Sequence, residues 1–186
     1  MGEPWDNWRP EIDGWSSDIL PFYERMAEEM PDGSSFVEVG VFKGRSLLYL
    51  AEALERRGKL LCTITGIDLF TASWDTGYGA EFDRHMAASS KAVCEMVTKL
   101  VGTSAQWAPH VVHPDLVFID ADHNYESVRD DIAAWLPHIT PTTIMCGHDY
   151  DGHLYGSFPG VTRAVNEAFA GRKIEQPSGT VWMVRQ

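Results

Sequence analysis

The feature that most restricts the fold of this chain is a regular alternation of short β-branched runs with segments of helical spacing. Such alternation is typical of a parallel sheet covered by helices on both faces. It predicts strands at residues 35–41, 60–70, 97–102, 115–120 and 142–150. It predicts helices at residues 19–30, 45–58, 79–96, 104–112, 125–139 and 160–169. Residues 172–186 have the pattern of a terminal hairpin, so we expect an α/β doubly wound sheet closed by an antiparallel edge hairpin.

The length of 186 residues, with 44% hydrophobic residues, suits a single core. We divide the chain into an N-terminal arm with its helix, residues 1–33, and an α/β domain, residues 34–186. The arm contains Trp5, Trp8 and Trp15, for which we favour packing against the body or a contact in a homo-oligomer.

The formal net charge of −12 disfavours nucleic acid as a partner, because such a surface repels phosphate backbones. No apolar run approaches the roughly 18 residues of a membrane span, and the N-terminus has no secretory signal pattern. Cys62, Cys94 and Cys146 are odd in number, widely spaced and set in apolar surroundings. We interpret them as reduced core thiols, which favours a cytoplasmic protein.

The first predicted strand and the turn after it, FVEVGVFKGRS, carry Glu38, Gly40 and Gly44. Ligands of open α/β sheets bind beyond the carboxyl ends of the strands, and glycines there let the backbone approach a ligand closely. The spacing is not G-x-G-x-x-G, because Phe42 follows Val41, so a bound pyrophosphate is disfavoured. An acidic residue inside the strand suits a cationic group of a ligand better than a phosphate. We interpret the basic residues of this turn, Lys43 and Arg45, as solvated.

A second polar group follows two later strands. Asp120, Asp122 and His123 end the fourth predicted strand, and His148 and Asp149 end the fifth. If these ends share a cleft, Asp120, His148 and Asp149 could hold a divalent cation such as Mg²⁺ or Mn²⁺. The metal-free alternative makes His123 or His148 the general base, with Asp122 beside them. The structural alternative makes Asp122 a helix N-cap and His123 a turn residue.

Four segments, VEVGVFKGRS, GIDLF, GTSAQWAP and FIDADHNYESVRDDI, occur in an order and spacing that resemble the class I S-adenosylmethionine-dependent methyltransferases. The resemblance covers about residues 34–186. It is nearest to the small O-methyltransferase-like group that includes sugar-modifying and antibiotic-tailoring enzymes. It implies a Rossmann-like, seven-stranded, mostly parallel sheet and S-adenosylmethionine as the cofactor.

The resemblance also implies roles for single residues. Glu38 would bear on the methionine amino end, and Gly40 and Gly44 would line the cofactor. Asp68, at the end of GIDLF, would accept hydrogen bonds from the ribose hydroxyls. The structural alternative for Asp68 is a helix N-cap or a loop carboxylate.

The resemblance also implies roles for three further residues. In addition, the chain departs from the family pattern at one expected metal ligand. Thr103 and Ser104 would lie by the adenine, and Asp120 near the sulfonium. Metal-dependent members carry a turn like DAD and an Asp-Asn pair at the next strand end, where this chain has His148 and Asp149.

We therefore expect O-methylation of a small hydroxylated acceptor, with assistance from a histidine or a divalent metal ion. A metal-dependent hydroxylase or hydrolase on the same scaffold is the alternative. Residues 149–161 are long for a β–α connection and would form a substrate-covering loop, in which His153 and Tyr155 could contact an acceptor. Trp74 and Tyr78 suit either a substrate wall or simple packing.

Overall fold

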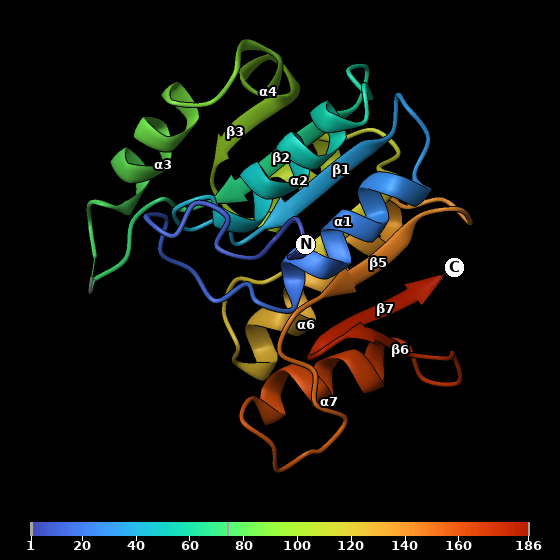
Figure 1. Cartoon of the computed structure of the whole chain (residues 1–186). Coiled ribbons are helices and arrows are strands. Elements are labelled where there is room, and N and C mark those ends of the chain that lie inside the picture. The colour runs from blue at the N-terminus through green and yellow to red at the C-terminus, as the bar shows by residue number, and fades with distance from the viewer. Residues whose placement is uncertain (1, 74, 186) are drawn as a thin grey trace.

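A single mixed sheet organises the chain, and the computed structural model describes residues 2–73 and 75–185 (Figure 1). The strands are β1 (Ser35–Val39), β2 (Thr63–Asp68), β3 (Val97–Val101), β4 (Leu116–Ile119), β5 (Ile144–Gly147), β6 (Glu175–Ser178) and β7 (Val181–Arg185). The α-helices are α1 (Ile19–Glu29), α2 (Arg45–Arg56), α3 (Tyr78–Ala87), α4 (Lys91–Met96), α5 (Ser104–Trp107), α6 (Tyr125–Trp135) and α7 (Pro159–Ala168). Short 3₁₀ turns at Ala108–His110 and Leu136–His138 follow α5 and α6.

The strand order is β3-β2-β1-β4-β5-β7-β6. The first five strands in this order pair in parallel, whereas β7 pairs antiparallel with both β5 and β6. The order reverses between β1 and β4, and open α/β sheets bind ligands at the carboxyl side of such a switch point. The predicted doubly wound sheet with an antiparallel C-terminal hairpin is confirmed.

Two apolar layers cover the sheet because successive strand residues point to opposite faces. Buried residues of α1, α2, α3 and α4 pack on one face, which includes Phe36 of β1 and Phe118 of β4. Buried residues of α6 and α7 pack on the other face, which includes Val37 and Val117 of the same strands. The helix α1 thus belongs to the same core as the strands that follow it.

The N-terminal arm is tied to the start of α2 by two basic residues. Arg45 Nη1 donates to the carbonyl oxygens of Arg9 at 2.6 Å and Ile12 at 2.9 Å. Lys43 Nζ lies 3.0 Å from Asp13 Oδ2 and 3.2 Å from Glu81 Oε2. The prediction that Lys43 and Arg45 are merely solvated was wrong, because backbone and carboxylate partners from remote segments were not visible in the local sequence.

The three tryptophans of the arm differ in environment. Trp5 and Trp8 pack against the core, and Trp8 Nε1 donates to Glu52 at 2.8 Å. Trp15 is 82% exposed and stacks on Phe42 with ring centroids 6.4 Å apart. Packing against the body therefore accounts for the first two and leaves the face of Trp15 largely open.

Two other local predictions need correction. The helix expected at residues 79–96 is divided into α3 and α4, because Ser90 caps a new helix by accepting a hydrogen bond from Val93 N at 3.2 Å. Cys62 and Cys146 are buried as expected, but Cys94 is exposed. The short helix α4 turns the side chain of Cys94 outward.

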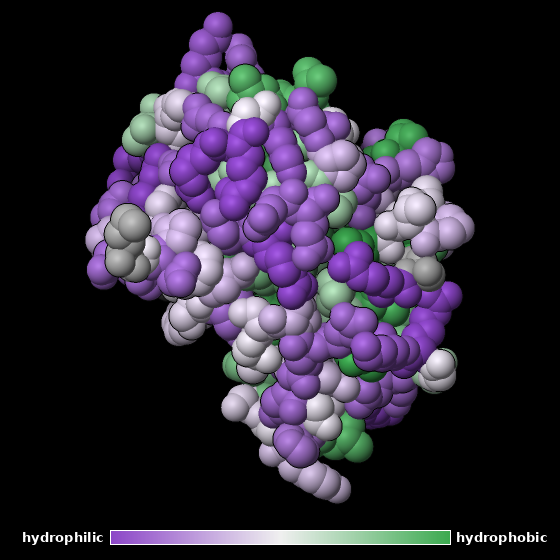
Figure 2. All heavy atoms as spheres, turned by 45° about the vertical axis from the view of Figure 1, so that its right-hand side comes forward, coloured by the Kyte–Doolittle hydropathy of each residue, from purple (hydrophilic) through white to green (hydrophobic). Residues whose placement is uncertain are grey.

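The described surface is strongly polar. Figure 2 shows a face of mostly hydrophilic side chains with apolar ones in small, scattered groups, in keeping with the net charge of −12. Among residues 2–73 and 75–185, no helix has the length and apolar character needed to cross a bilayer.

Gly40 supplies a sharp test of how closely β1 approaches the turn after β4. Its φ is +89°, and a Cβ built there would lie 2.1 Å from the carbonyl oxygen of Asp120. We expect Gly40→Ala to lower the free energy of unfolding by about 3 kcal/mol or more, because backbone must move as well as adopt a strained φ. Urea unfolding followed by circular dichroism measures this loss.

Gly58→Ala is the matched control. Its φ is +70°, but a Cβ there meets no atom within 4 Å. This variant carries only the left-handed cost of about 1 kcal/mol. Equal losses in the two variants would show that the contact between Gly40 and Asp120 has no energetic importance.

Candidate active site

The carboxyl edge of the sheet carries unusual backbone conformations. Phe42, Phe70 and Asp149, which follow β1, β2 and β5, have φ values of +51°, +53° and +63°. Residues with a Cβ rarely adopt this left-handed region, and such strain concentrates at functional sites. These left-handed residues therefore lie at the carboxyl edge of the sheet, which the strand order also indicates as the ligand-binding edge.

Asp68 ends β2, and the backbone holds its carboxylate. Its Oδ2 accepts a hydrogen bond from Phe42 N at 2.9 Å, and its Oδ1 accepts bonds from Phe70 N at 2.7 Å and Tyr78 Oη at 2.8 Å. Tyr78 is thus buried behind Asp68 and packs there, whereas Trp74, its predicted companion, lies outside the described residues. Beside Asp68, Leu69 and Val101 are 54% and 60% exposed, which gives the carboxylate an apolar border.

Glu38 lies inside β1 between α1 and α2 and is 2% exposed. Its Oε2 accepts a hydrogen bond from Tyr23 Oη and its Oε1 accepts one from Ser46 Oγ, both at 2.7 Å. No ion pair of the described residues includes Glu38. Burial dominates and raises its pKa to about 8, the two hydroxyl donors oppose the shift, and the negative charges of Asp120 and Asp68 add to it.

Thr103 and Ser104 open α5 just after β3. Thr103 forms a capping box with Gln106, whose Oε1 accepts a hydrogen bond from Thr103 N at 2.9 Å. Ser104 is 1% exposed, and its Oγ accepts a hydrogen bond from Trp135 Nε1 at 3.2 Å. The predicted adenine contacts of these residues remain predictions; the side chain of Ser104 is directed into the core.

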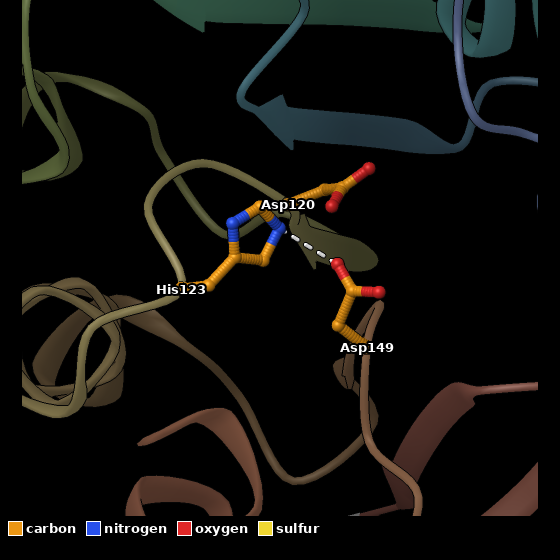
Figure 3. Close-up of side chains that lie close together, drawn as sticks. All are labelled: Asp120, His123 and Asp149. Atoms are coloured by element: carbon orange, nitrogen blue, oxygen red, sulfur yellow. Dashed lines mark ion pairs between the residues drawn. The ribbon is translucent and has the colours of Figure 1, made fainter. Parts of the chain in front are cut away.

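Asp120, His123 and Asp149 converge from the ends of β4 and β5 (Figure 3). One ligand atom from each lies within 4.8 Å of the others, so the three could hold a metal ion. The shortest contact, 2.7 Å, joins His123 Nε2 to Asp149 Oδ2. The ring of His123 also stacks on Phe158 of the loop before α7, with centroids 4.3 Å apart.

His148 is surrounded by carboxylates and is 9% exposed. Its Nε2 lies 2.9 Å from Asp18 Oδ1, and its Nδ1 lies 3.3 Å from Asp149 Oδ2 and 3.6 Å from Asp120 Oδ1. Burial opposes the charged ring, but the carboxylates outweigh it and raise the pKa of His148 to about 12. The three residues whose ligand atoms converge include His123 and not His148, which the sequence had suggested as a metal ligand.

The neighbouring carboxyl groups respond to burial and to the two histidines. Burial raises the pKa of Asp120, and the hydrogen bond and charge of His148 only partly offset this. Burial also acts on Asp149, but hydrogen bonds from His123 and His148 hold its pKa well below the usual range. The hydrogen bond to Asp149 in turn raises the pKa of His123. The pair formed by His123 and Asp149 is therefore a base already oriented by a carboxylate.

Asp122 serves the turn that leads into α6. Its carboxylate accepts hydrogen bonds from Asn124 N at 3.1 Å and Ser127 Oγ at 2.9 Å. Asn124, rather than Asp122, is the N-cap residue of α6. The geometry thus favours the structural alternative for Asp122, and we leave it out of the candidate catalytic group.

Two residues of this edge escaped the sequence analysis. Tyr23 of α1 bonds to Glu38, and Asp18, just before α1, bonds to His148. Asp18 stands immediately before a predicted helix, where an Asp normally signals only a cap. Contacts spanning 130 residues of chain leave no local pattern.

Residues 37–150, more than half of the chain, match a family model described as a methyltransferase domain. The chain belongs to this methyltransferase family. It is accordingly an S-adenosylmethionine-dependent methyltransferase of class I. A search of curated protein sequences found no significant match.

Solved structures share the fold of the methyltransferase. CalS11, a TDP-rhamnose 3'-O-methyltransferase of calicheamicin biosynthesis, is 21% identical with a TM-score of 0.62, over 89% of this chain and 76% of its own. The O-methyltransferase NovP is 17% identical with a TM-score of 0.65, over 90% and 78% of the chains. Cofactor-bound Rv0187 from MTB is 16% identical with a TM-score of 0.67, over 92% and 81%. At these identities the likeness concerns the fold.

The side chains at the carboxyl edge of the methyltransferase fit S-adenosylmethionine, whose sulfonium and ammonium groups are cationic. Glu38, Asp68 and Asp120 place three carboxyl groups at this edge, and burial with mutual repulsion raises the pKa of Glu38 to about 8. A cationic ligand would bring a positive charge to these three carboxyl groups and so favour their ionised forms. Asp68 with its apolar border suits a ribose next to a flat base.

Asp68→Asn tests this fit. We expect the affinity for S-adenosylhomocysteine, measured by calorimetry, to fall about 10- to 100-fold, because a charge-assisted acceptor of hydroxyl hydrogen bonds is lost. Asp130→Asn, on the exposed face of α6, is the control and should bind as the wild type does. Wild-type affinity in Asp68→Asn would remove Asp68 from the cofactor site.

Glu38→Gln tests the buried acid through the pH dependence of stability. Between the unfolded pKa of 4.5 and the folded value of about 8, native Glu38 keeps its proton while the unfolded chain releases it. Wild-type stability should therefore fall as pH rises through this window, by about 2–4 kcal/mol more than in Glu38→Gln. Urea unfolding at about pH 5 and pH 8 gives the comparison, and parallel pH profiles of the two proteins would contradict the assignment.

Proposed function

We propose that the methyltransferase transfers the methyl group to an oxygen of a small hydroxylated acceptor, with His123 as the general base. The observation that carries the proposal is the 2.7 Å contact between His123 Nε2 and Asp149 Oδ2, next to Asp120 at the carboxyl edge. O-Methylation needs a hydroxyl oxygen whose proton is removed as it attacks, and an oriented imidazole performs this near neutral pH.

In this proposal Asp149 holds the ring of His123 and stabilises the imidazolium that forms, while Nδ1 remains to take the proton of the acceptor hydroxyl. Phe158 stacks on the ring and restricts its rotation. S-Adenosylmethionine supplies an activated methyl group on its sulfonium, and the transfer leaves neutral S-adenosylhomocysteine. The carboxyl groups of Asp120 and Glu38 favour the cationic cofactor in its site, and Glu38 would release its proton as the cation binds.

The same three side chains also suit a divalent cation. Asp120 and Asp149 offer hard oxygen atoms, and His123 a nitrogen, so Mg²⁺ or Mn²⁺ is the class of ion they would take. A cation there would lower the pKa of an acceptor hydroxyl and orient it. This form of assistance differs from general-base catalysis in one measurable respect, since it is lost when the metal is removed.

The loop between β5 and α7 supports a small acceptor. Asp151 accepts hydrogen bonds from His153 N, Ser157 N and Thr162 Oγ1, which gives this loop a defined shape. Tyr155 is 99% exposed, so its ring has apolar area free for a ligand. We propose that this loop forms the outer wall of the acceptor site.

The decisive test is a panel of phenols, catechols and sugars incubated with S-adenosylmethionine, with S-adenosylhomocysteine formation as the readout. We expect His123→Ala to lower the methyl-transfer rate about 10²- to 10⁴-fold, as loss of a positioned base does. His138→Ala, outside the convergent group, is the control and should retain the wild-type rate. Each reaction is run with EDTA, with Mg²⁺ and with Mn²⁺.

The outcomes separate the alternatives. A rate that survives EDTA and falls in His123→Ala supports general-base catalysis, whereas a rate restored only by Mg²⁺ or Mn²⁺ supports the cation. Wild-type activity in His123→Ala would refute the assigned role of this residue. Cofactor binding without methyl transfer to any oxygen in the panel would count against O-methylation of a phenol, catechol or sugar.

A further inference from the structure

Asp18 immediately precedes α1 and does not cap the helix through its side chain. It stands at the N-cap position, where the carboxylate of an Asp ordinarily accepts a hydrogen bond from its own helix. Here the side chain makes no capping hydrogen bond. The helix instead begins with Leu20 N donating to the carbonyl oxygen of Ser16 at 2.9 Å. A capping residue whose side chain is directed elsewhere points to a second requirement.

The carboxylate of Asp18 is directed toward two remote parts of the chain. Its Oδ2 accepts hydrogen bonds from Thr180 N at 2.8 Å and Thr180 Oγ1 at 3.0 Å. Its Oδ1 faces His148 Nε2 at 2.9 Å. These contacts span 162 and 130 residues of sequence, so they join the arm, the β6–β7 turn and the end of β5.

The β6–β7 turn makes room for this carboxylate. Gly179 precedes Thr180 with a φ of +48°, and a Cβ built there would lie 2.4 Å from Asp18 Oδ2. A side chain at this position would displace the carboxylate. The turn of the C-terminal hairpin is therefore shaped around a residue of the N-terminal arm.

The consequence for His148 follows from its donor inventory. A ring N–H of a histidine that faces a carboxylate has an acceptor, and contacts of this kind at both ring nitrogens hold the ring in one orientation. Asp18 faces Nε2, and Asp120 and Asp149 face Nδ1. Asp149 in turn contacts His123 at 2.7 Å. A continuous chain of polar contacts thus leads from the arm to the proposed base.

We propose that Asp18 is a positioning residue of the methyltransferase. It fixes the His148 ring with Nδ1–H directed at Asp120 and Asp149, and thereby sets the orientation of Asp149 against His123. The effect on catalysis rests on the proposed function, whereas the effect on the His148 ring does not. In this role Asp18 acts through His148, which contacts Asp120 and Asp149 directly.

The test is nuclear magnetic resonance of the full chain labelled with ¹⁵N in its histidine rings, with His148→Gln used to assign the signals. We expect the wild type to show slowly exchanging Nε2–H and Nδ1–H signals from His148. In Asp18→Asn the Nε2–H signal should be lost to exchange and the Nδ1–H signal should shift. Asp13→Asn is the matched control, since it removes another carboxylate that ties down the arm, through Lys43, without a contact to His148.

Thr180→Val keeps the proposal testable if Asp18→Asn fails to fold. It removes one donor to Asp18 Oδ2 and leaves the charge in place, so a smaller shift of the same two signals is expected. Unchanged His148 signals in Asp18→Asn, or in Thr180→Val where only that variant folds, would overturn the proposal. Equal changes in Asp13→Asn would also overturn it, because they would reflect anchoring of the arm alone.

A kinetic readout separates the two proposals. With an acceptor from the panel, Asp18→Asn should lower kcat about tenfold with little change in KM for S-adenosylmethionine, as expected for a residue that orients a catalytic group through another. In a His148→Gln background the same substitution should have no further effect. Altered ring signals without methyl transfer to the panel would leave the positioning role standing and refute the proposed O-methylation.

Discussion

The concentration of carboxyl groups at the carboxyl ends of β1, β2, β4 and β5 is the constraint on which the rest of the structure depends. Glu38, Asp68, Asp120 and Asp149 all lie at or beside this edge. Like charges in a partly buried site repel, and each must be compensated or protonated. Each of these carboxyl groups has a different set of partners, and these partners define the site.

Asp68 is compensated by backbone N–H groups of Phe42 and Phe70, which adopt left-handed conformations just after β1 and β2. Glu38 accepts hydrogen bonds from two hydroxyl groups, and burial raises its pKa to about 8 and favours the uncharged acid. A bound cation would favour the ionised carboxylate. Asp149 lies between two histidines, and its pKa falls accordingly. We propose a cationic ligand for the β1–β2 side of this edge and proton transfer for the β4–β5 side.

The arm contributes to the same electrostatic arrangement and is more than a covering segment. Lys43 and Arg45 bind it next to the β1 turn, and Asp18 binds it next to the end of β5. His148 lies within 3.6 Å of carboxylate oxygens of Asp18, Asp120 and Asp149, and these neighbours favour the charged form of its ring.

The sequence by itself determined the order and type of most elements, because periodicity of two and of 3.6 residues is a local property. It also identified Glu38, Asp68, Asp120, His123 and Asp149 as candidates, because charged residues at the ends of apolar strands are conspicuous in the linear pattern. Only the tertiary structure decided which of these meet. It grouped His123 with Asp120 and Asp149, committed His148 to Asp18, and turned Asp122 toward α6. The first two choices depend on contacts between separate elements, which lie 130 residues apart for His148 and Asp18, and neither helical nor strand periodicity carries information about such contacts.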